Sequence, residues 1–278
     1  MGSFDALSSA ISGMQAQSFA LQNISGNIAN SQTTAYKTTD TSFQDLLASQ
    51  FPGVGYSDGV QFLSTTSNTT QGSIQSATIG TYMAINGDGY FSVERPTSID
   101  ASGQPSFAGS SPAYTRRGDF QLDANGYLVN GAGSYLMGTP ASPTGAPSGT
   151  PQLLQFNSAT LPTGQGTLQN IAIGSNGQVE GTFTSGQTVN LAGIPLSSFA
   201  GAEFMQSGDG GTFTPTPQSG APQANAPGKI VGSALEASNT DITDQFTAMI
   251  MTQQAYGANT KVMTATNEML QTLTNMTL

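Results

Sequence analysis

Apolar residues near the start of the chain recur at steps of three and four, the spacing of one face of an amphipathic helix. The pattern predicts a helix from Phe4 to about Asn30, after which Ser31, Thr33 and Thr34 favour a turn. Four of its members stand seven positions apart, as they would in the seam of a coiled coil. The stripe consists of Phe4, Leu7, Ile11, Met14, Leu21, Ile24 and Ile28.

A second amphipathic pattern predicts one long helix over residues 242–277, about 54 Å in length at 1.5 Å per residue. Ser238, Asn239, Thr240 and Asp241 are all candidate N-caps, and the acids Asp241 and Asp244 suit the positive end of the helix dipole. Because polar residues alternate with apolar ones along its seam, the pair of terminal helices should be marginal alone and should need partner chains. The stripe consists of Ile242, Phe246, Met249, Ile250, Tyr256, Met263, Leu270 and Leu273.

The middle of the chain, from about Gly80 to Gly228, carries short alternating runs between turn residues and predicts β-structure. Asn125-Gly126 separates two such runs and predicts a hairpin. Pro, Gly and Ser dominate residues 139–151 and 206–228, which we expect to be linkers. The expected strands are 82–86, 90–94, 113–117, 120–123, 127–130, 134–137, 168–173, 178–183 and 188–196.

These patterns together predict an α+β chain. Residues 1–38 with 230–278 are expected to form a terminal helical assembly domain, in which helices from both chain ends pair as a coiled-coil-like unit. Residues 39–80 are expected to be an extended connecting segment, and residues 81–229 a β-rich outer domain.

The charge balance excludes several classes of partner. Only 8% of the residues are charged, the formal net charge is −10, and no basic residue stands between Arg117 and Lys229. A nucleic-acid binder needs a basic footprint to neutralise phosphates, so no nucleic-acid partner is expected. The acidic balance also disfavours an anionic membrane surface, and no stretch has the roughly 18 apolar residues that membrane insertion requires.

The chain contains no Cys, no His and no Trp. Disulfides and thiolate metal sites are therefore excluded, and the commonest general base is missing. We expect a structural protein with no cofactor rather than an enzyme. The first residues lack a basic region and a continuous apolar run, so no cleaved signal peptide is expected either.

Two short groups of residues partly resemble known ligand-binding motifs. Gly87-Asp88-Gly89 resembles part of a dinucleotide-binding turn, but the third glycine and the following helix are missing. Asp119, Asp123 and Asn125 could suggest calcium, but the twelve-residue ligand spacing is absent, and solvated turn acids are the simpler interpretation.

Two remote alternatives depend on the acidic residues and on the β-rich middle. A carboxylate-type glycan hydrolase could use two of Asp88, Glu94, Asp119 and Asp123, although sugar clefts usually carry Trp. A secreted adhesin would explain the β-rich middle, but it leaves the terminal helices unexplained.

Three segments of the chain carry further motifs. The first is Gly26-Asn27-Ile28-Ala29-Asn30 with Thr34-Ala35-Tyr36-Lys37. The second contains Gly87-Asp88-Gly89-Tyr90-Phe91 and then Tyr114-Thr115-Arg116-Arg117-Gly118. The third contains Leu235-Glu236-Ala237-Ser238-Asn239, then Gln253 and Tyr256, and Ala258-Asn259 before Lys261. Together the three segments resemble those of flagellar rod, hook and hook-associated proteins, with Gly26 and Ala35 standing where that family usually has Asn and Gly.

The resemblance implies a subunit that self-polymerises into a tubular axial segment of the bacterial flagellum, localised to the hook or basal body. It implies contacts with other axial proteins (rod, hook cap and hook–filament junction) and passage through the flagellar type III export machinery without signal cleavage. Residues near Glu236 and Asn259 are most similar to those of hook protein. Rod protein is the alternative, since hook proteins are usually longer than these 278 residues.

If the chain assembles in this way, the helix stripes should drive polymerisation by burying apolar surface between subunits. The expected assembly interface consists of Leu7, Ile11, Met14, Leu21, Ile28, Phe246, Met249, Tyr256, Met263 and Leu270.

Overall fold

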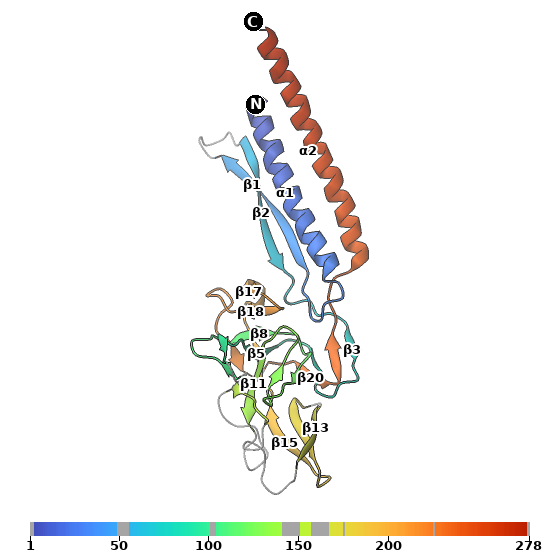
Figure 1. The fold of residues 1–278 in the computed structure, drawn as a ribbon. Coiled ribbons are helices and arrows are strands. Elements are labelled where there is room, and N and C mark those ends of the chain that lie inside the picture. The colour runs from blue at the N-terminus through green and yellow to red at the C-terminus, as the bar shows by residue number, and fades with distance from the viewer. Residues whose placement is uncertain are drawn as a thin grey trace. The chain divides into compact units, whose positions relative to one another are not determined.

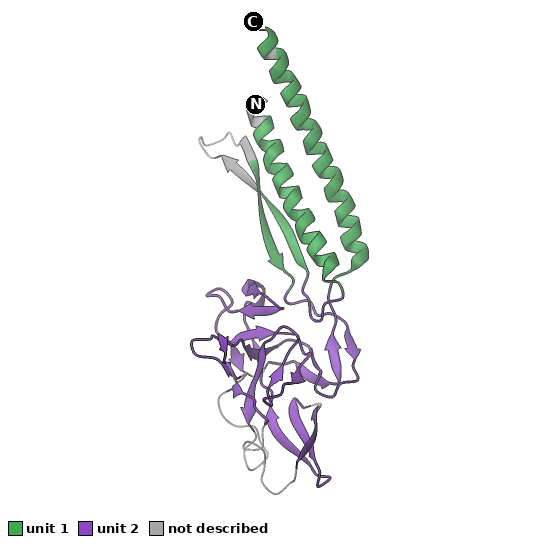
Figure 2. Cartoon of the chain, viewed as in Figure 1, with its two compact units in different colours: residues 1–31, 38–67, 240–278 green, residues 32–37, 68–239 purple. Residues whose placement is uncertain are grey.

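The computed structural model describes residues 3–48, 56–100, 104–140, 151–156, 167–174, 176–224 and 226–276. The chain divides into two compact units (Figure 2). Unit 1 comprises residues 1–31, 38–67 and 240–278, and unit 2 comprises residues 32–37 and 68–239. Among the described residues, helices are confined to unit 1 except for one short 3-10 turn, and strands occur in both units, so the predicted α+β class is confirmed.

Unit 1 consists of two long helices and a β-hairpin (Figure 1). Helix α1 spans Ser3–Ala29 and helix α2 spans Ile242–Met276, where the apolar patterns predict them. The helices run antiparallel, because Gly13 approaches Asn259 while Asn27, further along α1, hydrogen-bonds Gln245, further back on α2. No helix in the described ranges is long and apolar enough to cross a membrane.

The face of α1 that is buried within unit 1 carries mostly small side chains. Its buried residues are Ala10, Ala16, Ala20, Ile24 and Asn27. A Cβ atom added at Gly13 would lie 2.8 Å from Nδ2 of Asn259, so the two helix backbones approach closely at this level. Small residues permit this approach, and the larger apolar residues of the stripe are therefore displaced to its margins.

Threonines along α2 share one arrangement. Each donates its hydroxyl hydrogen to the backbone carbonyl oxygen four residues earlier, a bond that competes with water for the side chain. These residues are Thr247, Thr252, Thr260, Thr264, Thr266, Thr272 and Thr274. At the start of the helix, Oδ1 of Asp241 accepts the N–H of Thr243 at 2.7 Å, so the N-cap is the last of the four candidates that the sequence offers.

The hairpin of unit 1 lies within residues 39–80, which the sequence predicted to be a connecting segment. Strand β1 (Thr39–Ala48) pairs antiparallel with β2 (Tyr56–Thr66), with a register shift between Leu46 and Leu47. The hairpin packs on α1 through the rings of Phe19 and Phe62, whose centroids are 4.6 Å apart. Residues 39–48 and 56–66 therefore form a paired element of unit 1.

Unit 2 is built from short antiparallel strands, and the path of its largest sheet runs β13-β14-β15-β11-β5-β8-β18-β17. The strands before the chain midpoint are β3 (Ile74–Ser76), β4 (Met83–Asn86), β5 (Tyr90–Glu94), β6 (Ser98–Ile99), β7 (Pro105–Ser106), β8 (Ala113–Thr115), β9 (Gln121–Leu122), β10 (Leu128–Val129) and β11 (Tyr135–Pro140). Those after it are β12 (Gln152–Leu153), β13 (Leu168–Ile173), β14 (Gln178–Phe183), β15 (Thr188–Gly193), β16 (Leu196–Ser198), β17 (Gln206–Gly208), β18 (Thr212–Thr214), β19 (Gln223–Ala224), β20 (Lys229–Gly232) and β21 (Ala234–Glu236), with a 3-10 turn, η1, at Ala202–Phe204.

The predicted hairpin at Asn125-Gly126 is present, because Leu122 of β9 pairs with Leu128 of β10. Its connection is longer than a two-residue turn, since Oδ1 of Asp123 accepts the N–H of both Asn125 and Tyr127. The expected linker 206–228 contains the paired strands β17 and β18 as well as β19. Most of the other expected linker, residues 141–150, lies outside the described residues.

Two clusters of buried side chains form the core of unit 2. The larger includes Phe91 and Phe120, whose rings meet edge to face with centroids 6.0 Å apart. The smaller joins Tyr90 and Tyr114 to Phe199, Met205 and Phe213. Gly118 lets the chain pass the backbone of Met83, because an added Cβ would lie only 1.6 Å from the Met83 carbonyl oxygen.

Candidate assembly site

A buried carboxylate joins three distant parts of the chain within unit 2. Glu236, at the end of β21, has a side chain that is 0% exposed. Its Oε1 accepts hydrogen bonds from Nζ of Lys37 at 2.6 Å and from the N–H of Gly72 at 2.9 Å. Its Oε2 accepts one from Nη1 of Arg116 at 3.3 Å. We call Lys37, Arg116 and Glu236 the Glu236 cluster.

The two cations of the cluster are also held by backbone carbonyls. Nζ of Lys37 donates to the carbonyl oxygen of Thr70 at 2.6 Å, and Nη2 of Arg116 donates to that of Gly87 at 2.6 Å. The guanidinium of Arg116 lies over the ring of Tyr90, 5.5 Å from its centroid. Because a buried charge is tolerated only when it is paired and hydrogen-bonded, these contacts explain how three charged groups fit in the interior.

The electrostatics of the cluster follow from burial. Burial lowers the pKa of Lys37, and the neighbouring Glu236 carboxylate opposes that shift by favouring the ammonium. Burial raises the pKa of Tyr90, and Arg116 opposes that shift by favouring the phenolate. In both groups the loss of water outweighs the favourable neighbour.

A left-handed turn brings Lys37 to the cluster. Ala35 has φ 54°, a left-handed conformation that glycine adopts without strain. Its N–H donates to the carbonyl oxygen of Glu236 at 2.8 Å, and the N–H of Asn239 donates to that of Tyr36 at 3.2 Å. These two bonds hold the turn against the strand that carries Glu236 and outweigh the strain at Ala35.

Asn27 has a comparable role inside unit 1. Its side-chain amide exchanges hydrogen bonds with the backbone of Thr39, accepting at 2.9 Å and donating at 3.0 Å. Its Nδ2 also lies 3.0 Å from Oε1 of Gln245, to which it donates. One buried amide therefore fixes α1 to both β1 and α2, which explains why an Asn and no apolar residue stands at this point of the helix.

The expected assembly residues divide by exposure. Those that are half-buried are Leu7, Met14, Leu21, Ile28, Met249, Met263 and Leu270, and those that are exposed are Ile11, Phe246 and Tyr256. Exposed apolar residues of α2 outside the expected set include Ile242, Ile250, Met251, Val262 and Met269. Ile242 and Ile250 belong to the stripe that the sequence predicts, whereas Met251, Val262 and Met269 lie on another face of the helix.

The other family-motif residues occupy several kinds of position. Phe91, Tyr114 and Gly118 lie in the interior of unit 2, whereas Gln253 is exposed on α2. Gly89 has φ 145°, and Asn30 donates from its side chain to the Gly26 carbonyl oxygen at the end of α1. The remaining ones are Ala29, which is exposed, and Leu235, Ser238, Asn239 and Asn259, which are half-buried.

The acids considered for catalysis or calcium binding make turn contacts. Asp119 accepts two hydrogen bonds from the guanidinium of Arg117, at 2.8 and 2.9 Å, and Asp123 caps the hairpin connection. Gly87, Asp88 and Gly89 form the tight turn between β4 and β5, so no helix follows them. Within the described ranges no three acidic side chains gather as metal ligands would.

Comparisons with known proteins agree with this arrangement. Residues 84–181 match the family described as flagellar hook protein FlgE/F/G D1 domain, and residues 231–276 match the C-terminal family of flagellar basal body rod FlgEFG proteins. The chain is similar to the flagellar basal-body rod protein FlgG of Bacillus subtilis, with 30% identity over 97% of this chain and 98% of that protein. It is 30% identical to FlgG of Agrobacterium fabrum over 95% of this chain and 96% of that protein. With the flagellar hook protein FlgE of Brucella suis, it is 24% identical over 99% of this chain and 100% of that protein.

These matches define the class of the chain as a structural protein of the flagellar axial type. This chain belongs to the family of flagellar hook and basal-body rod proteins.

Proposed function

We propose that the chain is a subunit of the flagellar hook that polymerises with copies of itself into a tubular axial segment. The observation that carries the proposal is the apolar surface of α2. Phe246 is 50% exposed, Ile250 56% and Met251 65%, and a helix with so much exposed apolar surface requires neighbours to cover it. Repeated head-to-tail contacts that do not close into a ring produce a helical polymer.

The expected interface residues extend this surface onto α1, where Ile11 is also exposed. In the polymer, we propose, the terminal segments 1–38 and 230–278 act as the assembly domain, residues 39–80 connect, and residues 81–229 face outward. There Leu7, Met14, Leu21 and Ile28 would pack with Met249, Tyr256, Met263 and Leu270 as a coiled-coil-like seam. Other axial proteins and the flagellar type III export machinery would be its further partners.

A rod segment is the second candidate, and chain length favours it. FlgG of Bacillus subtilis aligns from end to end with this chain, whereas the alignment with FlgE of Brucella suis runs over 406 positions against 278 residues here. The hook proposal is supported by the resemblance of the residues near Glu236 and Asn259 to hook protein.

Two measurements test the proposal. Purified full-length chain should form tubes visible by electron microscopy, and a chain lacking residues 1–30 should not; tubes from the shortened chain would contradict the proposal. Curved, flexible tubes would support hook, and straight, rigid ones would support rod. In the producing cell, loss of the gene should leave basal bodies without a hook in the first case and without a complete rod in the second.

A further inference from the structure

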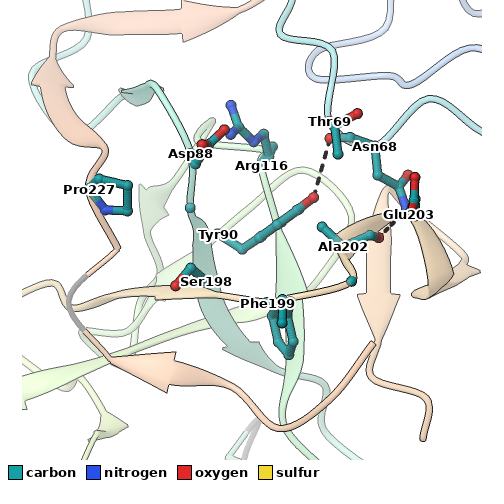
Figure 3. Close-up of a pocket in the computed structure, with 13 residues that line it drawn as sticks. Asn68, Thr69, Asp88, Tyr90, Arg116, Ser198, Phe199, Ala202, Glu203 and Pro227 are labelled. Carbon is teal, nitrogen blue, oxygen red and sulfur yellow. Dashed lines mark hydrogen bonds between the residues drawn. The ribbon is translucent and has the colours of Figure 1, made fainter. Parts of the chain in front are cut away.

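Helix α2 carries a second line of apolar side chains, which the described part of the chain leaves uncovered. In unit 2 the large rings of Tyr90 and Phe199 are buried and meet edge to face, with centroids 6.0 Å apart (Figure 3). On α2, by contrast, Met251 is 65% exposed, Val262 48% and Met269 61%. Exposed apolar residues that are scattered singly need no explanation, but an ordered line of them marks a contact surface.

The line follows the heptad spacing of a coiled coil. Its members alternate steps of four and three along α2, so they stay on one side of the helix. That side lies about 100° around the helix from the face that packs on α1, because Ala258 directly precedes Asn259, which faces Gly13 of α1. The line, which we call the outer seam, consists of Met251, Ala255, Ala258, Val262, Ala265, Met269, Thr272 and Met276, all exposed except the half-buried Ala255 and all apolar except Thr272.

A surface with this spacing fits a helix that has the same spacing. In a coiled coil each seam residue inserts between residues of the facing helix, and alanines let the two backbones approach closely. Helix α1 does not offer such a surface, because its exposed positions are mostly polar: Ser8, Ile11, Gln15, Ser18, Gln22, Ser25 and Ala29. Among the described helices, the outer seam therefore fits best against the outer seam of a second copy.

Two opposite charges beside the outer seam determine the direction of the second helix. Lys261 and Glu268 each stand immediately before a residue of the seam, at equivalent positions one heptad apart. Both are exposed, and neither forms a salt bridge within the described residues. In an antiparallel pair these positions face each other, so Lys261 of each copy meets Glu268 of the other. In a parallel pair they would face Thr266 and Leu273, which carry no charge.

The same antiparallel alignment places large residues opposite small ones. When Lys261 faces Glu268, Val262 meets Ala265 of the second copy, and Met269 meets Ala258. A two-fold axis relates the copies, so each of these contacts occurs in both directions. Large side chains opposite small ones fill an interface without voids or overlap. Charge and shape therefore select the same alignment.

We propose that two copies of the chain form an antiparallel dimer through the outer seam of α2. The dimer does not depend on the proposed polymer. Copies in a polymer built by one repeated head-to-tail contact all run the same way along its axis, whereas the two α2 helices of the dimer run in opposite directions. The dimer is therefore a separate, closed state of the subunit, which covers Met251 and Met269 before assembly.

Disulfide trapping tests the alignment in the full-length chain. The chain has no cysteine, so a single introduced thiol reports which residue it faces. Ala258→Cys and Met269→Cys change exposed positions. Below the concentration at which tubes form, oxidised glutathione should link the first variant to the second when they are mixed. Neither variant should link to itself, because two identical thiols would lie about 16 Å apart along the antiparallel helices, too far for a disulfide. Links between identical variants, or no links at all, would overturn the inference.

Charge reversal tests the flanking pairs. Lys261→Glu turns two attractions into two repulsions, so it should raise the dissociation constant of the dimer about tenfold, measured by sedimentation equilibrium. Adding Glu268→Lys to this variant should restore wild-type affinity. Lys229→Glu, at an exposed position in unit 2, is the matched control and should leave the affinity unchanged. All variants should keep the wild-type circular dichroism spectrum.

The outcomes separate this dimer from the proposed polymer. A wild-type chain that stays monomeric at about 100 µM, or a dimer that Lys261→Glu does not weaken, would overturn the dimer even if tubes form. A chain that forms the mixed disulfide but no tubes at higher concentration would support the dimer and contradict the polymer.

Discussion

Nζ of Lys37 lies 2.6 Å from Oε1 of Glu236, although 199 positions separate these two residues in the chain. Both side chains are almost fully buried, with exposures of 1% and 0%. The pair holds the segment 32–37 against strand β21, and Arg116 completes the arrangement from a third part of unit 2. Buried ion pairs therefore join three segments of unit 2, although the chain has few charged residues.

Glu236→Gln should destabilise unit 2 strongly. The variant leaves Lys37 and Arg116 buried without a counter-charge, and breaking a buried pair in this way costs about 3–5 kcal/mol. Denaturant unfolding of the purified full-length chain measures the loss. Glu268→Gln, at an exposed position on α2, is the matched control and should change stability by less than about 0.5 kcal/mol. Equal stability of the two variants would show that the pairing contributes little.

Gly118→Ala should prevent unit 2 from folding normally. The added methyl would lie 1.6 Å from the carbonyl oxygen of Met83, and a backbone atom cannot move aside as the end of a side chain can. Gly26→Ala is the contrasting change, because nothing lies within 4 Å of the added Cβ on α1. It should stabilise the helix by about 0.5–1 kcal/mol, since alanine is the better helix former. Far-UV circular dichroism and denaturant unfolding measure both variants.

Ala35→Gly should be close to neutral although it removes a buried methyl group. Relief of the left-handed strain at φ 54° is worth about 1–2 kcal/mol. It offsets the lost methyl, about 0.8 kcal/mol, and the added freedom of the unfolded chain, about 0.5–1 kcal/mol. Ala84→Gly, at a 0% exposed position in β4, gains no such relief and should lose about 1.5 kcal/mol. Equal losses at the two positions would contradict this account of Ala35.

Tyr114→Phe should alter the response of unit 2 to alkaline pH. Burial raises the pKa of Tyr114 above its ordinary 10.0, so the folded chain keeps a proton that the unfolded chain releases. The corresponding stability is fully present below pH 10 and is lost as pH rises through the folded pKa. The free energy of unfolding should therefore fall more steeply above pH 10 in the wild type than in the variant. If the free energies of unfolding of the two proteins fell in parallel above pH 10, this prediction would be wrong.

Phe246→Ser should impair polymerisation and leave the single chain intact. Phe246 is 50% exposed, so its replacement should lower monomer stability only by about 1–2 kcal/mol, the contribution of the half that is already buried. If the ring is buried between subunits, losing it raises the critical concentration by roughly ten- to a hundredfold. Ile99→Ser, at a 64% exposed position in unit 2, is the control and should polymerise as the wild type does. Sedimentation measures how much polymer the wild type and the two variants form at each protein concentration.

The sequence predicted those elements that local pattern determines. Both long helices and most strands of unit 2 follow from residue spacing, because burial on one face of an element sets its period. The hairpin β1–β2 was not predicted as a paired element, since Thr41, Ser42 and Gln44 give its first strand little alternation. Its pairing depends on contact with α1, as between Phe19 and Phe62, which no local window contains.

The Glu236 cluster shows the same limit at the candidate site. Each of its three members was noticed as part of a different motif, but nothing in the spacing indicated that they meet. A partial signal was present, since only six basic residues occur in the chain and four of them stand inside motifs that resemble the family: Lys37, Arg116, Arg117 and Lys261.

The threonines of α2 give this helix a surface that depends on its own folding. In an extended chain each hydroxyl hydrogen is available to water, and the segment is hydrophilic. In the helix the hydrogen is committed to a carbonyl of the preceding turn, as from Thr264 to Thr260 at 2.6 Å, and a neighbour meets a methyl group and an oxygen acceptor. The same residues therefore keep the unfolded segment well hydrated and give the folded helix a surface that associates more readily with a neighbour. The segment gains this capacity for association only when it folds into the helix.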